Sequence, residues 1–225
     1  MSDLDPLTRE SLIAKIKKQG FSDLRIEHSC EVADIALKLS DLMAGEGLNV
    51  ERGVVEKGSI LHDIGYLLTS GKPLTIPGWE GSGIIVPSDD INHPMLGALI
   101  VEKWGFSDRI SDCVLRHNIG CFTVAECKLL GVDPVPRKDC MPITIEEKIV
   151  HYSDHLMLLK RLRYDPLKDP EASAKACLPW LKHYFKERTG IVINMDHPTV
   201  QRELEIHNAF KKYLERLDVD FQGVT

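Results

Sequence analysis

The run at residues 61–65, LHDIG, sets two ionisable side chains next to each other where the surrounding apolar pattern calls for core. Burying an ionised carboxylate is costly unless the group is paired or coordinates a metal. In a purely structural interpretation, His62 hydrogen-bonds Asp63 or a backbone carbonyl. A metal site is the other interpretation, and it requires further His or Asp side chains that interrupt the apolar faces of other helices in the same way.

Apolar residues recur at helical spacing along most of the chain, which predicts that helices form most of its structure. We expect a short helix within residues 1–20, starting at Asp5-Pro6 and stopping at Gly20. A capping box formed by Thr144 and Glu147 predicts the start of a long helix. The other expected helices cover about 23–43, 50–63, 93–104, 107–117, a weak one near 123–130, and then 172–188 and 198–217.

Residues 69–92 are rich in Gly, Pro, Ser and Asp and show no helical period. Such a long connection predicts either a functional loop or a small β-hairpin around residues 84–86. As a lid beside a site, the segment would offer Lys72 and Trp79 as substrate contacts. A solvated surface loop is an equally compatible interpretation.

Composition narrows the classes of function. The 225 residues suit one large domain, and a formal charge of −6 argues against a general nucleic-acid binder, which needs a basic surface. No apolar run is long enough to span a membrane, and the polar, acidic start is unlike a signal peptide, so we expect a cytoplasmic protein. The six cysteines show no metal-binding spacing, and we expect them to be reduced thiols.

Five predicted helices each carry a metal-type side chain where an apolar stripe is interrupted. The six residues are His28, His62, Asp63, His93, His117 and Asp154. The presence of such a side chain on all five stripes is best explained if the stripes meet at one point and a metal ion binds there. Imidazoles and carboxylates without a thiolate favour Fe, Mn, Zn, Co or Ni over Mg or Ca. Six ligands exceed what one metal with an open position uses, so we predict two metals with Asp63 as the bridge.

Arg25 and Arg161 lie on the same stripes as His28 and Asp154. Either guanidinium could bind a phosphate through two parallel hydrogen bonds. For Arg161, an ordinary surface salt bridge is the alternative.

The order of these motifs resembles the HD-domain superfamily of metal-dependent phosphohydrolases over about residues 22–160. The resemblance rests on the opening R-x-x-H-S at 25–29, the HDIG run at 62–65 and the segment 147–154 that ends at Asp154. It implies an all-α helical bundle in a domain of residues 1–165, with the C-terminal helical extension 166–225 packed on it. That extension could also offer a surface for a homodimer.

The positions of His93 and His117 resemble the extra ligands of the binuclear subgroup, which typically uses iron or manganese. The resemblance then implies that His28, His62, Asp63 and Asp154 hold one metal. His93 and His117 would hold the second, with Asp63 bridging.

The leading hypothesis is hydrolysis of a phosphoester in a small nucleotide-like molecule by a two-metal activated water, with His62 and Asp63 as catalytic residues. Two hypotheses of other classes stay open. One is an HD-type mixed-valence di-iron oxygenase, and the other is a non-catalytic regulator that binds a nucleotide. If the protein is a hydrolase, its predicted partner is a small phosphorylated substrate.

Overall fold

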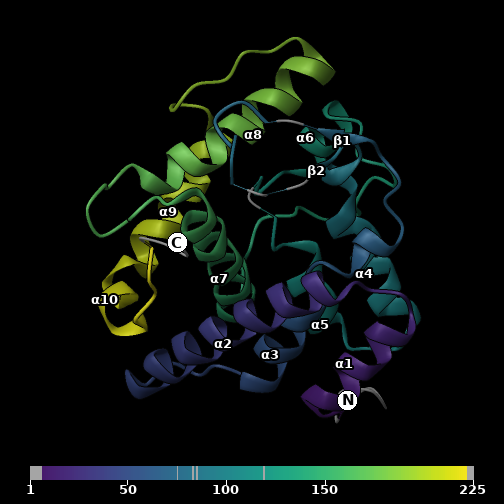
Figure 1. The fold of residues 1–225 in the computed structure, drawn as a ribbon, viewed down its shortest axis with the longest axis vertical. Helices are drawn as coiled ribbons and strands as arrows, with labels where there is room; N and C mark the ends of the chain where they lie inside the picture. Colours follow the sequence, from purple (N-terminus) through teal and green to yellow (C-terminus); the bar gives the residue numbers. More distant parts are fainter. Residues whose placement is uncertain (1–6, 75, 83, 85, 119, 222–225) are drawn as a thin grey trace.

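Helices form nearly all of the regular structure, which confirms the all-α prediction (Figure 1). The computed structural model describes residues 7–74, 76–82, 84, 86–118 and 120–221. Its helices are α1 (Arg9–Lys18), α2 (Asp23–Gly45), α3 (Arg52–Leu61), α4 (His93–Lys103), α5 (Asp108–Leu115), α6 (Val124–Leu129), α7 (Ile145–Leu162), α8 (Ala172–Thr189), α9 (Pro198–Phe210) and α10 (Leu214–Leu217). Three 3-10 turns are η1 (Ile64–Leu67), η2 (Asp90–Asn92) and η3 (Lys211–Tyr213).

The helices that carry the polar interruptions pack on one another. Helix α2 packs along α3 and α7, and α4 packs against α5 and η1 (Figure 1). Helix α3 also contacts α5 and α7. The apolar stripes therefore face a shared interior, and the polar residues on them are brought toward one region.

Local signals in the sequence explain most helix ends. Ser22 caps α2, its side chain accepting a hydrogen bond from the backbone of Arg25, and the capping box of Thr144 and Glu147 is present at α7. Helix α1 starts after Thr8, and the expected start at Asp5-Pro6 lies outside the described residues. The helix that we expected to continue through Asp63 ends at Leu61, because the chain tightens there into η1.

The segment 69–92 contains a minimal antiparallel sheet. Strand β1 (Pro73–Leu74) pairs with β2 (Val86–Pro87), with Leu74 opposite Val86. Strand β2 begins at Val86, within the expected 84–86 hairpin, but its partner β1 lies much earlier in the segment, so the two strands enclose a wider loop than expected. Ile85 is outside the described residues. Trp79 in this loop is buried, and its indole N–H donates to the Ala176 carbonyl of α8 (3.0 Å). The loop is therefore docked on the protein, which argues against the solvated interpretation.

The C-terminal helices pack on the rest of the chain. One hydrophobic cluster joins Trp79 and Phe122 to Trp180, and another joins Leu39 to Phe210. The boundary at residue 165 remains our proposal. No helix within the described ranges has the length and apolar character needed to cross a membrane. All six cysteines are free thiols, as predicted.

Candidate metal centre

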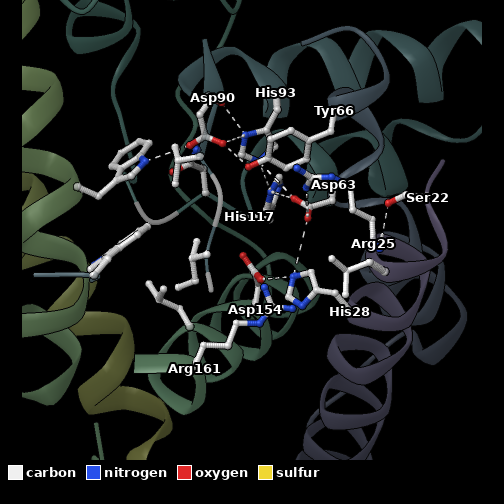
Figure 2. A pocket seen from close by; sticks show the side chains of 17 residues that line it. Ser22, Arg25, His28, Asp63, Tyr66, Asp90, His93, His117, Asp154 and Arg161 are labelled. Carbon is white, nitrogen blue, oxygen red and sulfur yellow. Dashed lines mark hydrogen bonds and ion pairs between the residues drawn. The ribbon is translucent and has the colours of Figure 1, made fainter. Parts of the chain in front are cut away.

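Three histidines surround one oxygen of the Asp63 carboxylate, and two of them, His93 and His117, are shown beside it in Figure 2. The Oδ1 atom of Asp63 lies 3.5 Å from Nε2 of His62, 3.5 Å from Nε2 of His93 and 3.7 Å from Nε2 of His117. These residues follow α3, begin α4 and follow α5, respectively. The cluster is buried, with 7% of Asp63 and none of His62 exposed.

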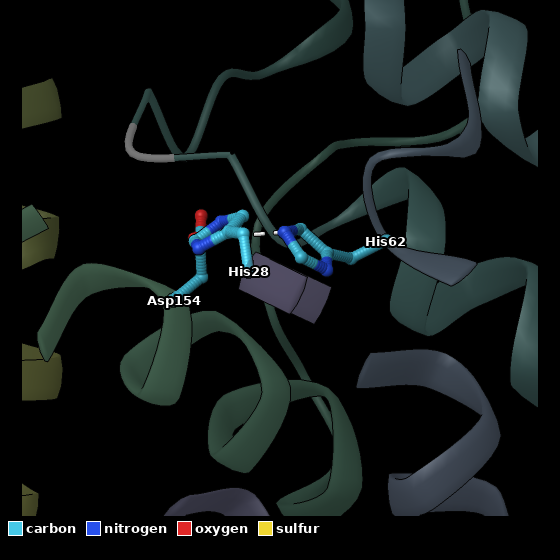
Figure 3. A group of neighbouring side chains, drawn as sticks. All are labelled: His28, His62 and Asp154. Atoms are coloured by element: carbon cyan, nitrogen blue, oxygen red, sulfur yellow. Dashed lines mark hydrogen bonds and ion pairs between the residues drawn. The ribbon is translucent and has the colours of Figure 1, made fainter. Parts of the chain in front are cut away.

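The other predicted ligands lie on the opposite side of the same carboxylate. The Oδ2 atom of Asp63 is 3.8 Å from Nε2 of His28 on α2. That nitrogen is 3.1 Å from Oδ1 of Asp154 on α7, and His62 Nε2 is 3.6 Å from the same Asp154 oxygen. Figure 3 shows His28, His62 and Asp154 converging from three separate elements. The structure thus brings together all six residues that the sequence singled out.

Three of the imidazoles are oriented in the same way, because each Nδ1–H donates to the backbone carbonyl three residues earlier. The pairs are His62 with Ser59 (2.7 Å), His93 with Asp90 (2.6 Å) and His117 with Val114 (2.6 Å). Helices α3 and α5 end at two of these places, so their last carbonyls lack helical partners and are free to accept. With Nδ1 protonated, a neutral ring turns its Nε2 lone pair toward the cluster, as in metal-bound histidines.

The lone pairs are arranged for a cation. The Nε2 atom of His62 is buried and has no hydrogen-bond partner among the described residues. The Nε2 atoms of His93 and His117 face each other at 2.9 Å, although both rings donate through Nδ1. Two lone pairs at this distance repel unless a proton or a metal ion lies between them. The donor set therefore fits divalent metal.

Charges within the cluster keep both carboxylates ionised. Burial by itself would raise the pKa of Asp63, but nearby imidazoles, His62 foremost, hold that pKa well below its usual range. Burial lowers the pKa of His62, but the carboxylates of Asp63 and Asp154 outweigh it and raise the pKa to about 9. Burial also lowers the pKa of His117, to about 4. Two ionised carboxylates surrounded by imidazoles that can exchange their protons for a metal ion make the centre a strong site for cations.

A buried carboxylate that the sequence pattern does not single out lies beside the centre. Asp90 accepts hydrogen bonds from the Tyr66 hydroxyl and from the indole N–H of Trp180 (3.0 Å). The Tyr66 ring stacks on His93, with 4.3 Å between ring centres. The guanidinium of Arg25 lies over the Tyr66 ring, 3.4 Å from its centre. Asp90 therefore fixes the aromatic ring that packs against a candidate ligand.

A cavity of about 360 Å³ opens beside the cluster. Every candidate ligand except His62 lines it, together with apolar side chains. The apolar lining is Leu24, Trp79, Ile84, Val86, Leu158 and Trp180. Apolar and aromatic side chains with a few convergent polar groups are the usual lining of a small-molecule site.

Of the four residues predicted to contact the substrate, some line the cavity and one does not. Arg25 lines the cavity with its Nη1 atom 3.4 Å from Asp63 Oδ2, and Trp79 contributes its ring. Arg161 also lines the cavity, and no carboxylate in the described part of the chain pairs with it, contrary to the salt-bridge alternative. Lys72 is exposed and is not among the residues that line the cavity. The structure brings three of the four predicted contacts to the site.

Comparisons with known proteins agree with the geometry. A family model described as HD domain matches residues 25–158. An uncharacterised protein of Methanocaldococcus jannaschii is 29% identical over 201 residues, which cover 87% of this chain and 95% of that protein. A tRNA (cytidine(56)-2'-O)-methyltransferase of Picrophilus torridus is 32% identical over 147 residues, 65% of this chain and 35% of that protein. Ribonuclease Y of Pseudothermotoga lettingae is 33% identical over 109 residues, 48% of this chain and 17% of that protein.

Among solved structures, the chain is similar to the HD domain of the phosphodiesterase PgpH of L. monocytogenes. The structure of that domain with cyclic-di-AMP has a TM-score of 0.47 and 19% identity, over 95% of this chain and 99% of that one. The structure without the nucleotide has a TM-score of 0.44 and 18% identity, over 91% of this chain and 98% of that one.

Proposed function

We propose a function from one premise, that this chain belongs to the HD-domain family. The matched segment, residues 25–158, contains all six candidate ligands from His28 to Asp154. Family membership and a buried His/Asp cluster support a metal-dependent phosphohydrolase in general. We infer the finer activity: hydrolysis of a phosphoester in a small nucleotide-like molecule by a two-metal activated water.

The observation that carries this proposal is the position of Asp63 between two groups of ligands. Its Oδ1 faces His93 and His117, and its Oδ2 faces His28. His62 lies at similar distances from Asp63 Oδ1 (3.5 Å) and Asp154 Oδ1 (3.6 Å), so it can join His28 and Asp154 in the second group. A carboxylate with its two oxygens turned to separate imidazoles is suited to bridge two ions.

In this proposal His28, His62, Asp63 and Asp154 would hold one ion. His93 and His117 would hold the other, with Asp63 shared. Imidazole and carboxylate ligands suit Fe, Mn, Zn, Co or Ni, and the resemblance to the binuclear subgroup makes iron or manganese the leading candidates. When bound, such a pair supplies Lewis acidity to a phosphoryl oxygen and lowers the pKa of water.

The residues around the centre would bind and orient the substrate. Arg25 is fixed by Asp63 and Tyr66, and it faces the cavity with N–H donors suited to a phosphate. Arg161 adds a second positive charge from α7. Trp79, Ile84 and Leu158 form an apolar wall where a planar base would pack. These positions support a small phosphorylated ligand with an aromatic part.

The test is hydrolysis of generic aryl phosphates by the full chain loaded anaerobically with Fe²⁺ or Mn²⁺. Bis(p-nitrophenyl) phosphate and p-nitrophenyl phosphate separate diesterase from monoesterase activity. We expect hydrolysis of at least one ester, reduced at least about 100-fold by Asp63→Ala because the shared ligand is lost. Asp196→Ala, which changes an exposed carboxylate elsewhere, is the matched control.

A fully metallated wild type that hydrolyses none of a panel of aryl and nucleotide phosphoesters would contradict the proposal. The same iron-loaded protein also tests the oxygenase alternative. Oxygen consumption without phosphate release, with a paramagnetic signal from a mixed-valence pair, would assign oxygenase chemistry. Nucleotide binding without turnover in either assay would assign the regulator.

A further inference from the structure

A second group of metal-type side chains lies in the interior, away from the cavity. Its members are Cys121 in the segment after α5, His151 on α7 and Glu203 on α9, each about 1% exposed. The Sγ atom of Cys121 lies 3.9 Å from Nε2 of His151, and Oε2 of Glu203 lies 3.0 Å from the same nitrogen. One ligand atom from each residue lies within 4.8 Å of the other two. Three distant segments of the chain therefore converge on one point.

The geometry does not fit a cysteine nucleophile. In a catalytic triad the nucleophile and the carboxylate contact different nitrogens of the imidazole, but here both face Nε2. The thiol is also inaccessible, and burial together with the charge of Glu203 raises its pKa well above the usual value. Cys121 is therefore a protonated thiol unless something replaces its proton.

A simple ion pair between His151 and Glu203 explains only part of the cluster. It uses one carboxylate oxygen, and the other, Oε1, is buried without a hydrogen-bond partner in the described part of the chain. It gives no role to Cys121, whose φ of 42° is unusual for a residue other than glycine. An unpaired carboxylate oxygen and an adjacent thiol are what a cation would satisfy.

We propose that Cys121, His151 and Glu203 bind a zinc-type divalent ion at a site separate from the candidate metal centre. Tetrahedral zinc, with bonds of about 2.3 Å to sulfur and about 2.0–2.2 Å to nitrogen and oxygen, separates its S and N ligands by about 3.6 Å and its N and O ligands by about 3.4 Å. The observed 3.9 Å and 3.0 Å lie close to these values. A divalent ion with one thiolate and one carboxylate is also neutral overall, which suits a buried position.

The ion would connect the candidate metal centre to the C-terminal helices. Cys121 lies four residues after His117, and His151 lies one helical turn before Asp154 on α7. Glu203 belongs to α9, which packs beside α7 (Figure 1). A fourth position would be left to water or to Cys177 of α8, a buried thiol whose pKa is raised by burial and by the charge of Glu203. The ion would thus fix the positions of the segment after α5, α7 and α9 relative to one another.

The test is cobalt substitution of the full chain, because a thiolate bound to Co²⁺ gives a charge-transfer band in the near ultraviolet. None of the six residues of the candidate metal centre is a cysteine, so the band reports the second site alone. We expect the band when metal-free, reduced protein is titrated anaerobically with Co²⁺. Cys121→Ser should abolish it, and Cys140→Ser should retain it, since Cys140 is a buried thiol paired with Cys127 instead (Sγ–Sγ 3.9 Å).

Glu203→Gln gives an independent reading if Cys121→Ser fails to fold. The amide oxygen can still accept a hydrogen bond from His151, so a purely structural pair would survive, whereas the charge needed by a metal is gone. We expect Co²⁺ affinity at the second site to fall at least 10-fold. Folded wild type without the band at saturating Co²⁺, a band that survives Cys121→Ser, or unchanged affinity in Glu203→Gln would overturn the proposal. None of these outcomes depends on phosphoester hydrolysis.

Discussion

Arg25 and Arg161 both line the cavity, but the protein holds only one of them in place. Arg25 contacts Asp63 and stacks on Tyr66, so its side chain is ordered before any ligand binds. Arg161 is exposed and has no ion-pair partner among the described residues. A guanidinium at a cavity rim without a protein anion is available to a ligand anion.

We therefore expect Arg161→Ala to weaken substrate binding without affecting the fold. A hydrogen bond to a charged group contributes about 1.5–3 kcal/mol, so KM should rise about 10-fold or more. The Tm should stay within about two degrees, because exposed substitutions rarely change stability by more than about 0.5 kcal/mol. Steady-state kinetics and thermal melts measure the two effects, with Lys182→Ala on α8 as the control. An unchanged KM would show that Arg161 does not contact the substrate.

Asp90 gives a second prediction for a single residue. Its carboxylate accepts from both Tyr66 and Trp180, whereas an amide has only one accepting atom. Asp90→Asn should leave one buried donor unpaired, shift the ring that packs on His93 and lower metal affinity about 10-fold. Metal titration followed by calorimetry measures this. Tyr66→Phe removes one donor but keeps the stacked ring, so its loss should be smaller. Equal affinities for Asp90→Asn and wild type would exclude a positioning role.

Among the secondary-structure elements, the contact between η1 and α4 depends on one glycine. A Cβ atom on Gly65 would lie 1.8 Å from the carbonyl oxygen of His93 and 2.7 Å from the backbone nitrogen of Gly97. Gly65→Ala must therefore push α4 away and displace His93. We expect a loss of at least about 3 kcal/mol in unfolding free energy, together with reduced metal stoichiometry.

Chemical denaturation and elemental analysis measure both effects of Gly65→Ala. The control is Gly45→Ala at the end of α2, where an added Cβ meets nothing within 4 Å. Alanine there should be neutral or stabilising by up to about 1 kcal/mol. A Gly65→Ala protein of wild-type stability and metal content would show that α4 can shift without cost.

Helical periodicity explains why the meeting of the six candidate ligands could be predicted and the contacts of other residues could not. A polar residue on an apolar stripe is visible within one helix, so His28 and Asp154 stood out before their meeting point was known. Asp90 and Trp180 are 90 residues apart, and no pattern in the sequence indicates that their side chains are in contact. Glu203 was missed for the same reason. It lies on an amphipathic helix among other acidic residues, and only the fold shows that it is buried against His151.

For the whole molecule, the C-terminal helices complete the cavity as well as the core. Helix α8 supplies Trp180 to the cavity wall, and its backbone holds Trp79 of the long loop. The cavity shape therefore depends on residues outside the matched family segment of 25–158. Substrate preference should accordingly depend on this part of the chain, while metal binding depends on α2, α3, α4, α5 and α7.

Proton binding at the metal centre should also make stability depend on pH. His62 has a pKa of about 9 in the folded protein, above the usual 6.5, so the folded state binds the extra proton between these values. This contribution to stability is fully present below about pH 6.5 and is lost as the pH rises through about 9. Buried thiols such as Cys113 and Cys121, whose pKa values are raised by burial, act in the same direction in the alkaline range.

We therefore predict that the metal-free protein loses stability between about pH 6.5 and 9, by roughly 3 kcal/mol at most from His62. Bound metal should reverse this trend, because a coordinating imidazole cannot keep the proton and metal affinity rises as protons leave. Urea unfolding at both pH values, with a chelator and with Mn²⁺, measures the difference. His62→Gln should flatten the chelated profile. If the chelated wild type is equally stable or more stable at pH 9, the charge arrangement that we assign to His62, Asp63 and Asp154 is incorrect.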